Sequence, residues 1–472
     1  MIVRLRAGLA LAMAVACACA RPPDLVRRPA ERPAALLLSN VRVVDVVVGA
    51  ILEDRDVLVR GERIEKIAHG GSVEPPLGAQ RIDGRERTLV PGYVDMHAHV
   101  GSGSSPSWKR RLPDPETNLR ALLYCGVTTV LDPAGLSTTA FDLRDRVARG
   151  ELLGPRQFAA GPIITASGAH PAPVLQHLAP WWLRWYLIPR FTKQVSTANE
   201  GRAAVGEIAG YGADVVKVVV DRIPPEAPLL SPEIVEAVVA EARSRGLRTV
   251  AHIGSYEDAR VAAEAGVAAW VHGVYKERLS DEAVARLASY RIPMVATMVV
   301  FESYATLRDP PRRPTALEVD TVEPAVLSAF DEIPPRDPAI EFFREYLDDL
   351  EAMRSAWRGN VRRLHEAGVT ILAGSDIQTA VFPGPGLHRE FALLGEAGLP
   401  PIEVLRAATL HAARFLDQSE DPGFGIVAEG KRADLVLLRG NPLADVAALS
   451  QIEAVIHRGV LLERIARVDA KD

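Results

Sequence analysis

Most of the chain alternates short apolar runs with longer segments of helical periodicity. Eight runs of four to seven residues predict buried strands. The predicted strands are Tyr93–Met96, Thr128–Leu131, Gln157–Ala160, Asp214–Val220, Thr249–Ile253, Ala268–Val271, Pro293–Val299 and Thr370–Ala373. Segments of helical periodicity, such as Ser231–Arg245 and Tyr256–Ala265, separate most of them. Eight strand–helix units predict an α/β fold, a (β/α)8 TIM barrel whose chemistry is expected at the carboxyl ends of its strands.

Three segments of strand-like pattern flank this alternation. Leu36–Asp45 and Asp56–Arg60 precede it, and Ala433–Leu438 follows it. Apolar residues in these segments alternate with polar ones or form short runs, which favours strands. We therefore predict a small discontinuous β-sandwich domain built from both chain ends, residues 35–89 and 423–472, around a barrel of residues 90–422.

The N-terminus has the three parts of a secretory signal over residues 1–20: a basic start, a short apolar run and small residues at its end. The apolar run is shorter than the roughly 20 residues that span a bilayer. Cleavage is expected after Ala20, or lipid attachment at Cys17, which closes a segment similar to a bacterial lipoprotein box. Either route places the protein in the periplasm, in the medium or on a membrane. The alternative is a frayed N-terminal helix of a cytosolic protein. Residues 21–34, rich in Arg and Pro, are expected to form a tether.

The composition is that of an ordinary globular protein. The 472 residues are 48% hydrophobic and 24% charged, with a net charge of -5. These values exclude a disordered chain, a collagen, a coiled coil and a multi-span membrane protein. The acidic balance argues against a nucleic-acid partner, which needs a clustered basic face. A small-molecule substrate is expected, and a homo-oligomer stays open.

Residues that bind metals stand at the ends of the predicted barrel strands. His97 and His99 close the first strand as His-x-His, and residues two apart on a strand point to the same side. Four more candidates lie on later strands: Lys217, His252, His272 and Asp376. A lysine within an apolar strand carries a costly charge unless it is paired or neutralised. The pattern favours one cluster of ligands over six unrelated buried polar residues.

The segment Val90–His99, which contains the His-x-His pair, resembles the first-strand signature of the amidohydrolase superfamily of metal-dependent hydrolases. The Lys, His, His and Asp then follow in that family's order. Gly425–Leu437 is similar to the returning β-domain segment of the same enzymes. The resemblance covers about residues 35–465. It is greatest to the branch of imidazolonepropionase-like proteins and zinc-dependent Xaa-Pro dipeptidases.

The resemblance implies a centre of two divalent metal ions. One ion would be held by His97, His99 and Asp376. The other would be held by His252 and His272. Lys217 would bridge the two ions as an N-carboxylated lysine, because a protonated ammonium cannot be a ligand. Zn²⁺ is the expected metal, and Mn²⁺, Fe²⁺ and Co²⁺ suit the same ligands.

The implied reaction is hydrolysis of an amide C–N bond by a metal-bridging hydroxide, with Asp376 as general base and then general acid. Deaminase relatives usually carry a Glu three residues after the histidine of the fifth strand, where this chain has Ser255. This difference and the presence of Lys217 argue against a mononuclear deaminase or a true imidazolonepropionase. A dipeptide or an N-acyl amino acid is the expected substrate. The alternatives are a lactone, ester or phosphotriester hydrolase with the same centre, and an inactive small-molecule-binding protein.

Three further residues are candidates for binding substrate. His170 ends a Ser-Gly-Ala-His turn after the third strand, where dipeptidase-like relatives place a histidine that hydrogen-bonds the substrate carbonyl. Tyr275, three residues beyond His272, could reach a substrate carboxylate or oxyanion. Arg222, just past the fourth strand, is a weaker candidate for a carboxylate. The alternative for each is a structural role.

Two connections, residues 171–198 and 301–340, are too long for a bare barrel. The first holds a Trp-rich loop, Pro180–Phe191, with half of the six tryptophans of the chain. Aromatic residues with Arg at the catalytic face suit a lid over an apolar substrate, or contact with a membrane surface. Packing against the second insertion is the alternative.

Overall fold

The computed structural model describes residues 24–179, 181–307, 309, 312–331, 341–342 and 344–467. The predicted signal, including Cys17, lies outside the described residues, as does part of the second insertion. Within these ranges, none of the helices has the length and apolar character that a bilayer crossing requires.

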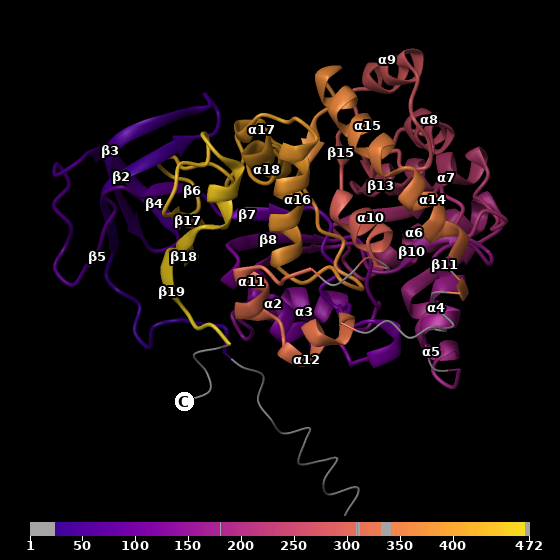
Figure 1. Ribbon diagram of the computed structural model, residues 1–472, viewed down its shortest axis with the longest axis horizontal. Coiled ribbons are helices and arrows are strands. Elements are labelled where there is room, and N and C mark those ends of the chain that lie inside the picture. The colour runs from indigo at the N-terminus through magenta and orange to yellow at the C-terminus, as the bar shows by residue number, and fades with distance from the viewer. Residues whose placement is uncertain are drawn as a thin grey trace, which may run out of the picture.

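Parallel strands alternate with helices around a barrel (Figure 1). Three strands form one parallel sheet: β7 (Tyr93–Asp95), β8 (Val127–Asp132) and β9 (Arg156–Ala159). The second sheet holds β11 (Thr192–Val195), β10 (Ile163–Ala166), β12 (Val215–Val219), β13 (Arg248–His252), β14 (Ala269–Val271), β15 (Met294–Val295) and β16 (Ile371–Leu372). Two backbone hydrogen bonds join the sheets, from Met96 N to Ala373 O and from Asp214 N to Ala159 O, both 2.9 Å. The predicted TIM barrel is confirmed.

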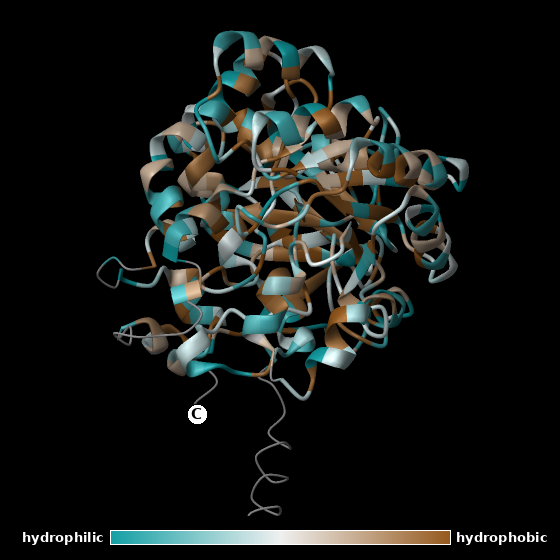
Figure 2. Ribbon diagram, turned by 90° about the vertical axis from the view of Figure 1, so that its right-hand side faces the viewer, coloured by the Kyte–Doolittle hydropathy of each residue, from teal (hydrophilic) through white to brown (hydrophobic). Residues whose placement is uncertain are grey.

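Helices surround the strands. They include α2 (Pro115–Tyr124), α3 (Ala140–Ala148), α6 (Ala198–Gly210), α7 (Pro232–Ser244), α8 (Tyr256–Glu264), α9 (Asp281–Ser289), α15 (Arg354–Glu366), α16 (Pro385–Glu396), α17 (Pro401–Ala407) and α18 (Leu410–Asp417). The sequence predicts the start of α7, where the Ser231 side chain accepts from Ile234 N at the N-cap. Figure 2 shows apolar strands at the centre and polar residues on the surrounding helices.

Additional elements extend the loops at the carboxyl ends of the strands and elsewhere. They are α4 (Ala172–Leu178), α5 (Arg184–Phe191), α10 (Met298–Ala305), α11 (Ala316–Thr321), α12 (Pro324–Leu327), α14 (Arg344–Ala352) and the short helices η1 (Ser107–Lys109), η2 (Ser328–Phe330) and η3 (Val446–Ser450). Both predicted insertions therefore contain helices.

Two strand predictions need correction. The strand predicted over Pro293–Val299 is only two residues long as β15, because Thr297 takes a left-handed conformation (φ 45°) and α10 begins at Met298. The third barrel strand is split. β9 pairs with β8, whereas β10 pairs with β12, and Gly161 (φ 72°) turns the chain between them.

Both ends of the chain build one mixed sheet beside the barrel. Its strands are β1 (Val26–Arg27), β2 (Leu36–Asp45), β3 (Ala50–Arg60), β4 (Arg63–His69), β5 (Gln80–Asp83), β6 (Thr88–Pro91), β17 (Leu435–Leu438), β18 (Ile452–His457) and β19 (Val460–Arg464). β17 pairs antiparallel with β6, so the returning segment lies directly beside the strand that leads into β7. Part of the predicted tether is packed instead of free, because Leu25 and Val26 are buried and β1 pairs with β19.

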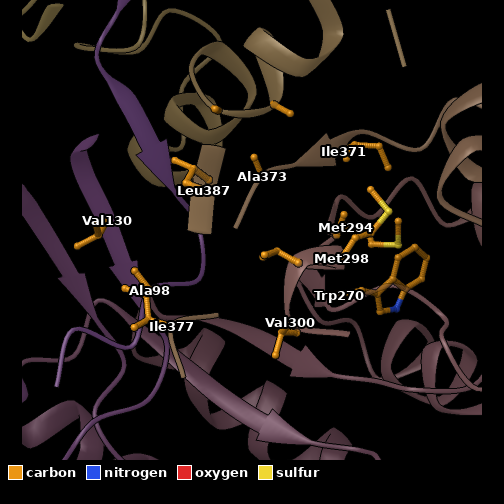
Figure 3. Close-up of a cluster of buried hydrophobic side chains, with 14 of the residues drawn as sticks. Ala98, Val130, Trp270, Met294, Met298, Val300, Ile371, Ala373, Ile377 and Leu387 are labelled. Atoms are coloured by element: carbon orange, nitrogen blue, oxygen red, sulfur yellow. The ribbon is translucent and has the colours of Figure 1, made fainter. Parts of the chain in front are cut away.

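Apolar side chains fill the space around the barrel strands. Figure 3 shows Trp270, Met294 and Ile371 in one buried cluster with residues of α10 and α16. Each of these three side chains is at most 2% exposed. This packing fixes the strands whose carboxyl ends carry the predicted ligands.

Candidate metal centre

The first and last barrel strands bring three of the predicted ligands together. His97 and His99 follow β7, and their Nε2 atoms lie 3.0 Å apart. Asp376 follows β16, and its Oδ1 lies 3.1 Å from His99 Nε2 and 3.6 Å from His97 Nε2. The Asp376 backbone N–H donates to His97 O (2.6 Å), which fixes the two segments against each other.

Lys217 enters the same cluster from the middle of β12. Its side chain is buried, and Nζ lies 3.2 Å from His97 Nε2. Burial lowers the pKa of the Lys217 ammonium to about 8, although Asp376 and Asp132 oppose this effect. An amine with a lowered pKa gives up its proton more readily, and the neutral form is the one that carboxylation requires.

The remaining two histidines lie on the other side of the cluster. The ring centroids of His252 and His272 are 4.3 Å apart, and those of His97 and His272 are 4.9 Å apart. His272 Nδ1 lies 3.9 Å from Asp376 Oδ2. The structure therefore brings all six predicted ligands to the mouth of one barrel.

In three of these rings, one nitrogen is held by a neighbouring oxygen. His99 Nδ1 lies 3.1 Å from Ala134 O, His252 Nε2 lies 3.1 Å from Asp221 Oδ2, and His272 Nδ1 lies 2.7 Å from Thr297 Oγ1. Such contacts fix the orientation of metal-binding histidines and leave the other ring nitrogen for the ion. The contacts fit a metal centre.

The backbone at these strand ends is strained. His272 (φ 72°), Thr297 (φ 45°) and Asp376 (φ 55°) end or follow β14, β15 and β16 in the left-handed region. Residues other than glycine adopt that region only at a cost in conformational energy, which is greatest for β-branched residues. Such residues are common at functional sites. Gly374 allows the close approach of β16 to β7, because a Cβ there would lie 2.8 Å from His97 Cβ.

A buried carboxylate supports this junction from behind. Asp95 Oδ1 accepts from His97 N (3.0 Å) and Ser375 N (2.9 Å), and Oδ2 accepts from Ser375 Oγ (2.5 Å). Burial raises the pKa of Asp95 to about 6. Asp95 thus joins the segment of His97 to that of Asp376.

The electrostatics of three of the four histidines also fit a divalent cation. Burial holds the pKa of His97 and His272 well below its usual range, and it lowers that of His252. Neutral imidazoles are the form that binds metals. The pKa of His99 is raised to about 9, because its contacts with Asp132 and Asp376 outweigh burial. His97, His272 and Asp376 offer ligand atoms that all lie within 4.8 Å of one another.

The three predicted substrate-binding residues differ in position. The ring centroid of His170 lies 5.0 Å from that of His252, and His170 Nδ1 is buried with no hydrogen-bond partner among the described residues. Tyr275 is buried behind His252, and its hydroxyl donates to Asp221 Oδ2 (2.6 Å). Arg222 is exposed and donates to Ala227 O (3.2 Å), so the structure does not bring it to the cluster.

Sequence reasoning missed several residues around the ligands. Asp221 is fully buried against His252, Tyr275 and Lys276. Burial alone would raise its pKa, but the contacts with His252 and Lys276 hold that pKa below its usual range. Asp132, 3.8 Å from His99 Nδ1, is the second missed carboxylate. Asp132 ends an apolar strand and Asp221 follows one, as most of the predicted ligands do. That position was the signal available in the sequence.

Asp376 is held by a chain of two side chains. Gln378 Nε2 donates to Asp376 Oδ2 (3.2 Å), and Tyr304 OH donates to Gln378 Oε1 (2.7 Å).

Ser255, which stands where deaminase relatives carry a Glu, caps α8 in a capping box with Asp258. Its hydroxyl therefore serves the helix.

Comparison with known proteins agrees with the fold and the cluster. The model of the amidohydrolase family matches residues 88–462, so the chain belongs to the amidohydrolase family and is a hydrolase that acts on carbon–nitrogen bonds. An uncharacterized protein of Mycobacterium tuberculosis is 26% identical over 400 residues, which are 82% of this chain and 88% of that protein. An ochratoxinase of Aspergillus niger is 24% identical over 400 residues, 79% of this chain and 74% of that protein.

Among solved structures, a prolidase complexed with N-methylphosphonate-L-proline is similar to this chain, with a TM-score of 0.73 and 25% identity. The match covers 91% of this chain and 100% of the prolidase. The superfamily indicated by the His-x-His segment is therefore confirmed, together with the barrel and its additional β domain.

Proposed function

We propose that this protein is an exported amidohydrolase with a centre of two metal ions that cleaves the amide bond of a dipeptide or an N-acyl amino acid. The observation that carries the proposal is the convergence of six predicted ligands in one cluster, five at the carboxyl ends of barrel strands and Lys217 from the middle of β12. The prolidase among its structural relatives supports the substrate class, since its ligand carries phosphorus on the nitrogen of an amino acid.

In this proposal the six ligands would be divided between two ions. His97, His99 and Asp376 would hold the first ion, and the pair of His252 and His272 would hold the second. An N-carboxylated Lys217 would bridge them. Zn²⁺ suits this set of nitrogen and oxygen ligands. When bound, the ions supply Lewis acidity toward water and toward the scissile carbonyl.

Asp376 moves the proton in this proposal. Its carboxylate accepts a proton from the attacking water and returns that proton to the leaving nitrogen. Gln378 holds Asp376 Oδ2, so that Oδ1 faces His99 and His97. His170 binds the substrate carbonyl. Burial keeps the pKa of its ring well below the usual range, so the ring is neutral and donates from one nitrogen only.

Metal analysis and a substrate screen test the proposal together. The purified protein should contain about two divalent ions per chain and should hydrolyse members of a library of dipeptides and N-acyl amino acids. Turnover of lactones, esters or phosphotriesters alone, with metal present, would establish the alternative hydrolase. A protein without metal and without turnover of any of these would be a binding protein.

Export is tested at the N-terminus of the protein recovered from its native host. The mature chain should begin at Arg21, or at a lipid-modified Cys17. Recovery from the cytosol with Met1 intact would contradict export while leaving the chemistry of the site untouched.

A further inference from the structure

The connection after β10 presents an unusual group of exposed aromatic side chains. Trp181, Trp182 and Trp185 are 79%, 59% and 74% exposed. Tryptophan has the largest side chain, and proteins usually bury most of it. Three such side chains within five residues form a local apolar surface, the tryptophan patch, that folding leaves in water.

The remainder of α5 is held on the body of the protein, so the patch is not a loosely packed core. Phe191, at the end of α5, packs against Ile163 and Val219 of the barrel strands. Thr192 Oγ1 donates to Ile188 O (2.9 Å), and the Arg190 guanidinium lies 3.9 Å from the centre of the Tyr186 ring. Phe191 thus anchors the end of α5 on the barrel, and the other two contacts order the last turn of the helix, while the tryptophans remain exposed.

The sequence around the tryptophan patch carries positive charges and no negative side chains. The 48 residues between Glu151 and Glu200 contain no Asp or Glu, although the chain as a whole holds 60. The same stretch contains four cations: Arg156, Arg184, Arg190 and Lys193. Of these, Lys193 is paired with Glu207 of α6, and Arg156 lies 3.4 Å from Asp434 of the β domain. The two cations within α5 itself, Arg184 and Arg190, are therefore not neutralised by any carboxylate of their own connection.

We propose that the tryptophan patch, with Arg184 and Arg190, is a docking surface for an anionic lipid bilayer. Tryptophan places its apolar ring in the outer acyl region while its indole N–H stays in the polar interface. Cations beside it gain energy from anionic headgroups and pay little for desolvation there. A lipid surface thus satisfies both features of the patch. An apolar protein surface would leave the charges of Arg184 and Arg190, which donate to the backbone oxygens of Ala179 and Tyr186, without an anionic partner. This inference does not depend on the substrate of the barrel.

Quenching of tryptophan fluorescence by vesicles with brominated acyl chains tests the proposal in the full-length protein. The other tryptophans are shielded, because Trp270 and Trp357 are 1% exposed and Trp108 is partly buried with its Nε1 bonded to Ala329 O. Residues 1–23 contain no Trp, so vesicle binding through them alone gives no quenching. We expect strong quenching by vesicles rich in phosphatidylglycerol. Binding to purely phosphatidylcholine vesicles should be weaker on the order of tenfold.

Vesicle flotation of variants gives the second measurement. In flotation, the triple variant Trp181→Ala, Trp182→Ala and Trp185→Ala should lose most of the wild-type binding to vesicles rich in phosphatidylglycerol. The matched control, Val47→Ala, Val48→Ala and Leu77→Ala, removes exposed apolar side chains from the β domain and should bind as the wild type does.

Three outcomes would overturn the proposal. The first is flotation of the wild type without any quenching, which would assign binding to the N-terminus alone. The second is a dimer in sedimentation that only the tryptophan variant loses, with no quenching by lipid, which would assign the patch to a second copy of the chain. The third is a loss of hydrolysis of a soluble substrate in that variant, with unchanged vesicle binding, which would make the patch a lid.

Discussion

At the scale of single residues, the ring nitrogen that contacts a neighbouring side chain orients the imidazole, and the other ring nitrogen is left to bind a metal. Asp221 and Thr297 hold one nitrogen of His252 and His272, so each ring can offer its other nitrogen without reorientation. Pre-oriented ligands bind a metal more tightly, because less conformational freedom is lost on binding. The centre is therefore built from two layers of side chains.

Lys217→Ala tests the bridging role at this scale. Removal of the Lys217 amine removes the buried amine that lies next to His97 and that the proposal makes a carbamate between the two sets of ligands. We expect metal content to fall from about two ions per chain to less than one, with hydrolysis lost. Lys193→Ala is the matched control, because Lys193 is also a lysine but pairs with Glu207 outside the centre. A Lys217→Ala protein with two ions and full activity would remove the bridge from the mechanism.

Asp376→Asn separates proton transfer from metal binding. The amide keeps the size of the side chain and one ligating oxygen, so metal content should change little. Amide hydrolysis should fall by about 10²–10⁴-fold, the usual contribution of general acid–base catalysis. The leaving group of a p-nitrophenyl ester departs as p-nitrophenolate without protonation. Hydrolysis of these esters should therefore fall less than hydrolysis of amides. Values of kcat/KM for both substrate types decide the matter. Equal losses would leave base catalysis only, and near-wild-type amide turnover would exclude Asp376 from the mechanism.

At the scale of elements, α10 and α16 meet through a buried acid. Glu390 of α16 is fully buried and accepts from Val299 N at the start of α10 (2.8 Å). Burial raises its pKa to about 8. The folded protein therefore keeps a proton on Glu390 between about pH 4.5 and 8, whereas the unfolded chain releases it.

Unfolding in this window releases one proton, so a rise in pH favours the unfolded state. The contribution of Glu390 to stability is greatest below pH 4.5 and is lost as pH rises toward 8, at about 1.4 kcal/mol per pH unit for one proton. Glu390→Gln keeps an acceptor for Val299 and cannot ionise. We expect the variant to be more stable than the wild type at pH 8 and similar at pH 5 in urea denaturation. Parallel pH profiles for both proteins would contradict the assignment.

Helices and strands were predictable from the sequence where a single pattern determines the local structure. Eight apolar runs identified the barrel, and ligand-type residues at strand ends identified its mouth. The sequence could not reveal the turn at Thr297, because Met298–Phe301 is as apolar as a strand and only the backbone conformation distinguishes it as a helix start. It likewise could not show that Tyr275 faces Asp221 instead of an open cleft, since that depends on packing against Phe301, 4.3 Å away between ring centroids.

At the scale of the whole molecule, the candidate centre joins the segments that close the barrel, whereas the strands of the β domain form a separate sheet. The segments after β7, β14 and β16, the middle of β12 and the last residue of β13 all contribute side chains to the cluster. Without a cation, these buried polar groups face one another with lone pairs and charges only partly satisfied. A bound ion would therefore link segments that lie up to 279 positions apart in sequence, from His97 to Asp376.

Metal removal should loosen the mouth of the barrel and leave the β domain intact. Binding to the folded state alone stabilises a protein by about 4 kcal/mol at a ligand concentration a thousand times the Kd. A chelator should thus lower the unfolding temperature. Hydrogen exchange should accelerate at the carboxyl ends of β7, β12, β13 and β16, where the ligands lie. Amides that pair β2 with β3 belong to the separate sheet and serve as the internal control. Equal acceleration in both regions would show that metal stabilises the whole chain nonspecifically, and unchanged exchange at the strand ends would contradict a structural role for the ions.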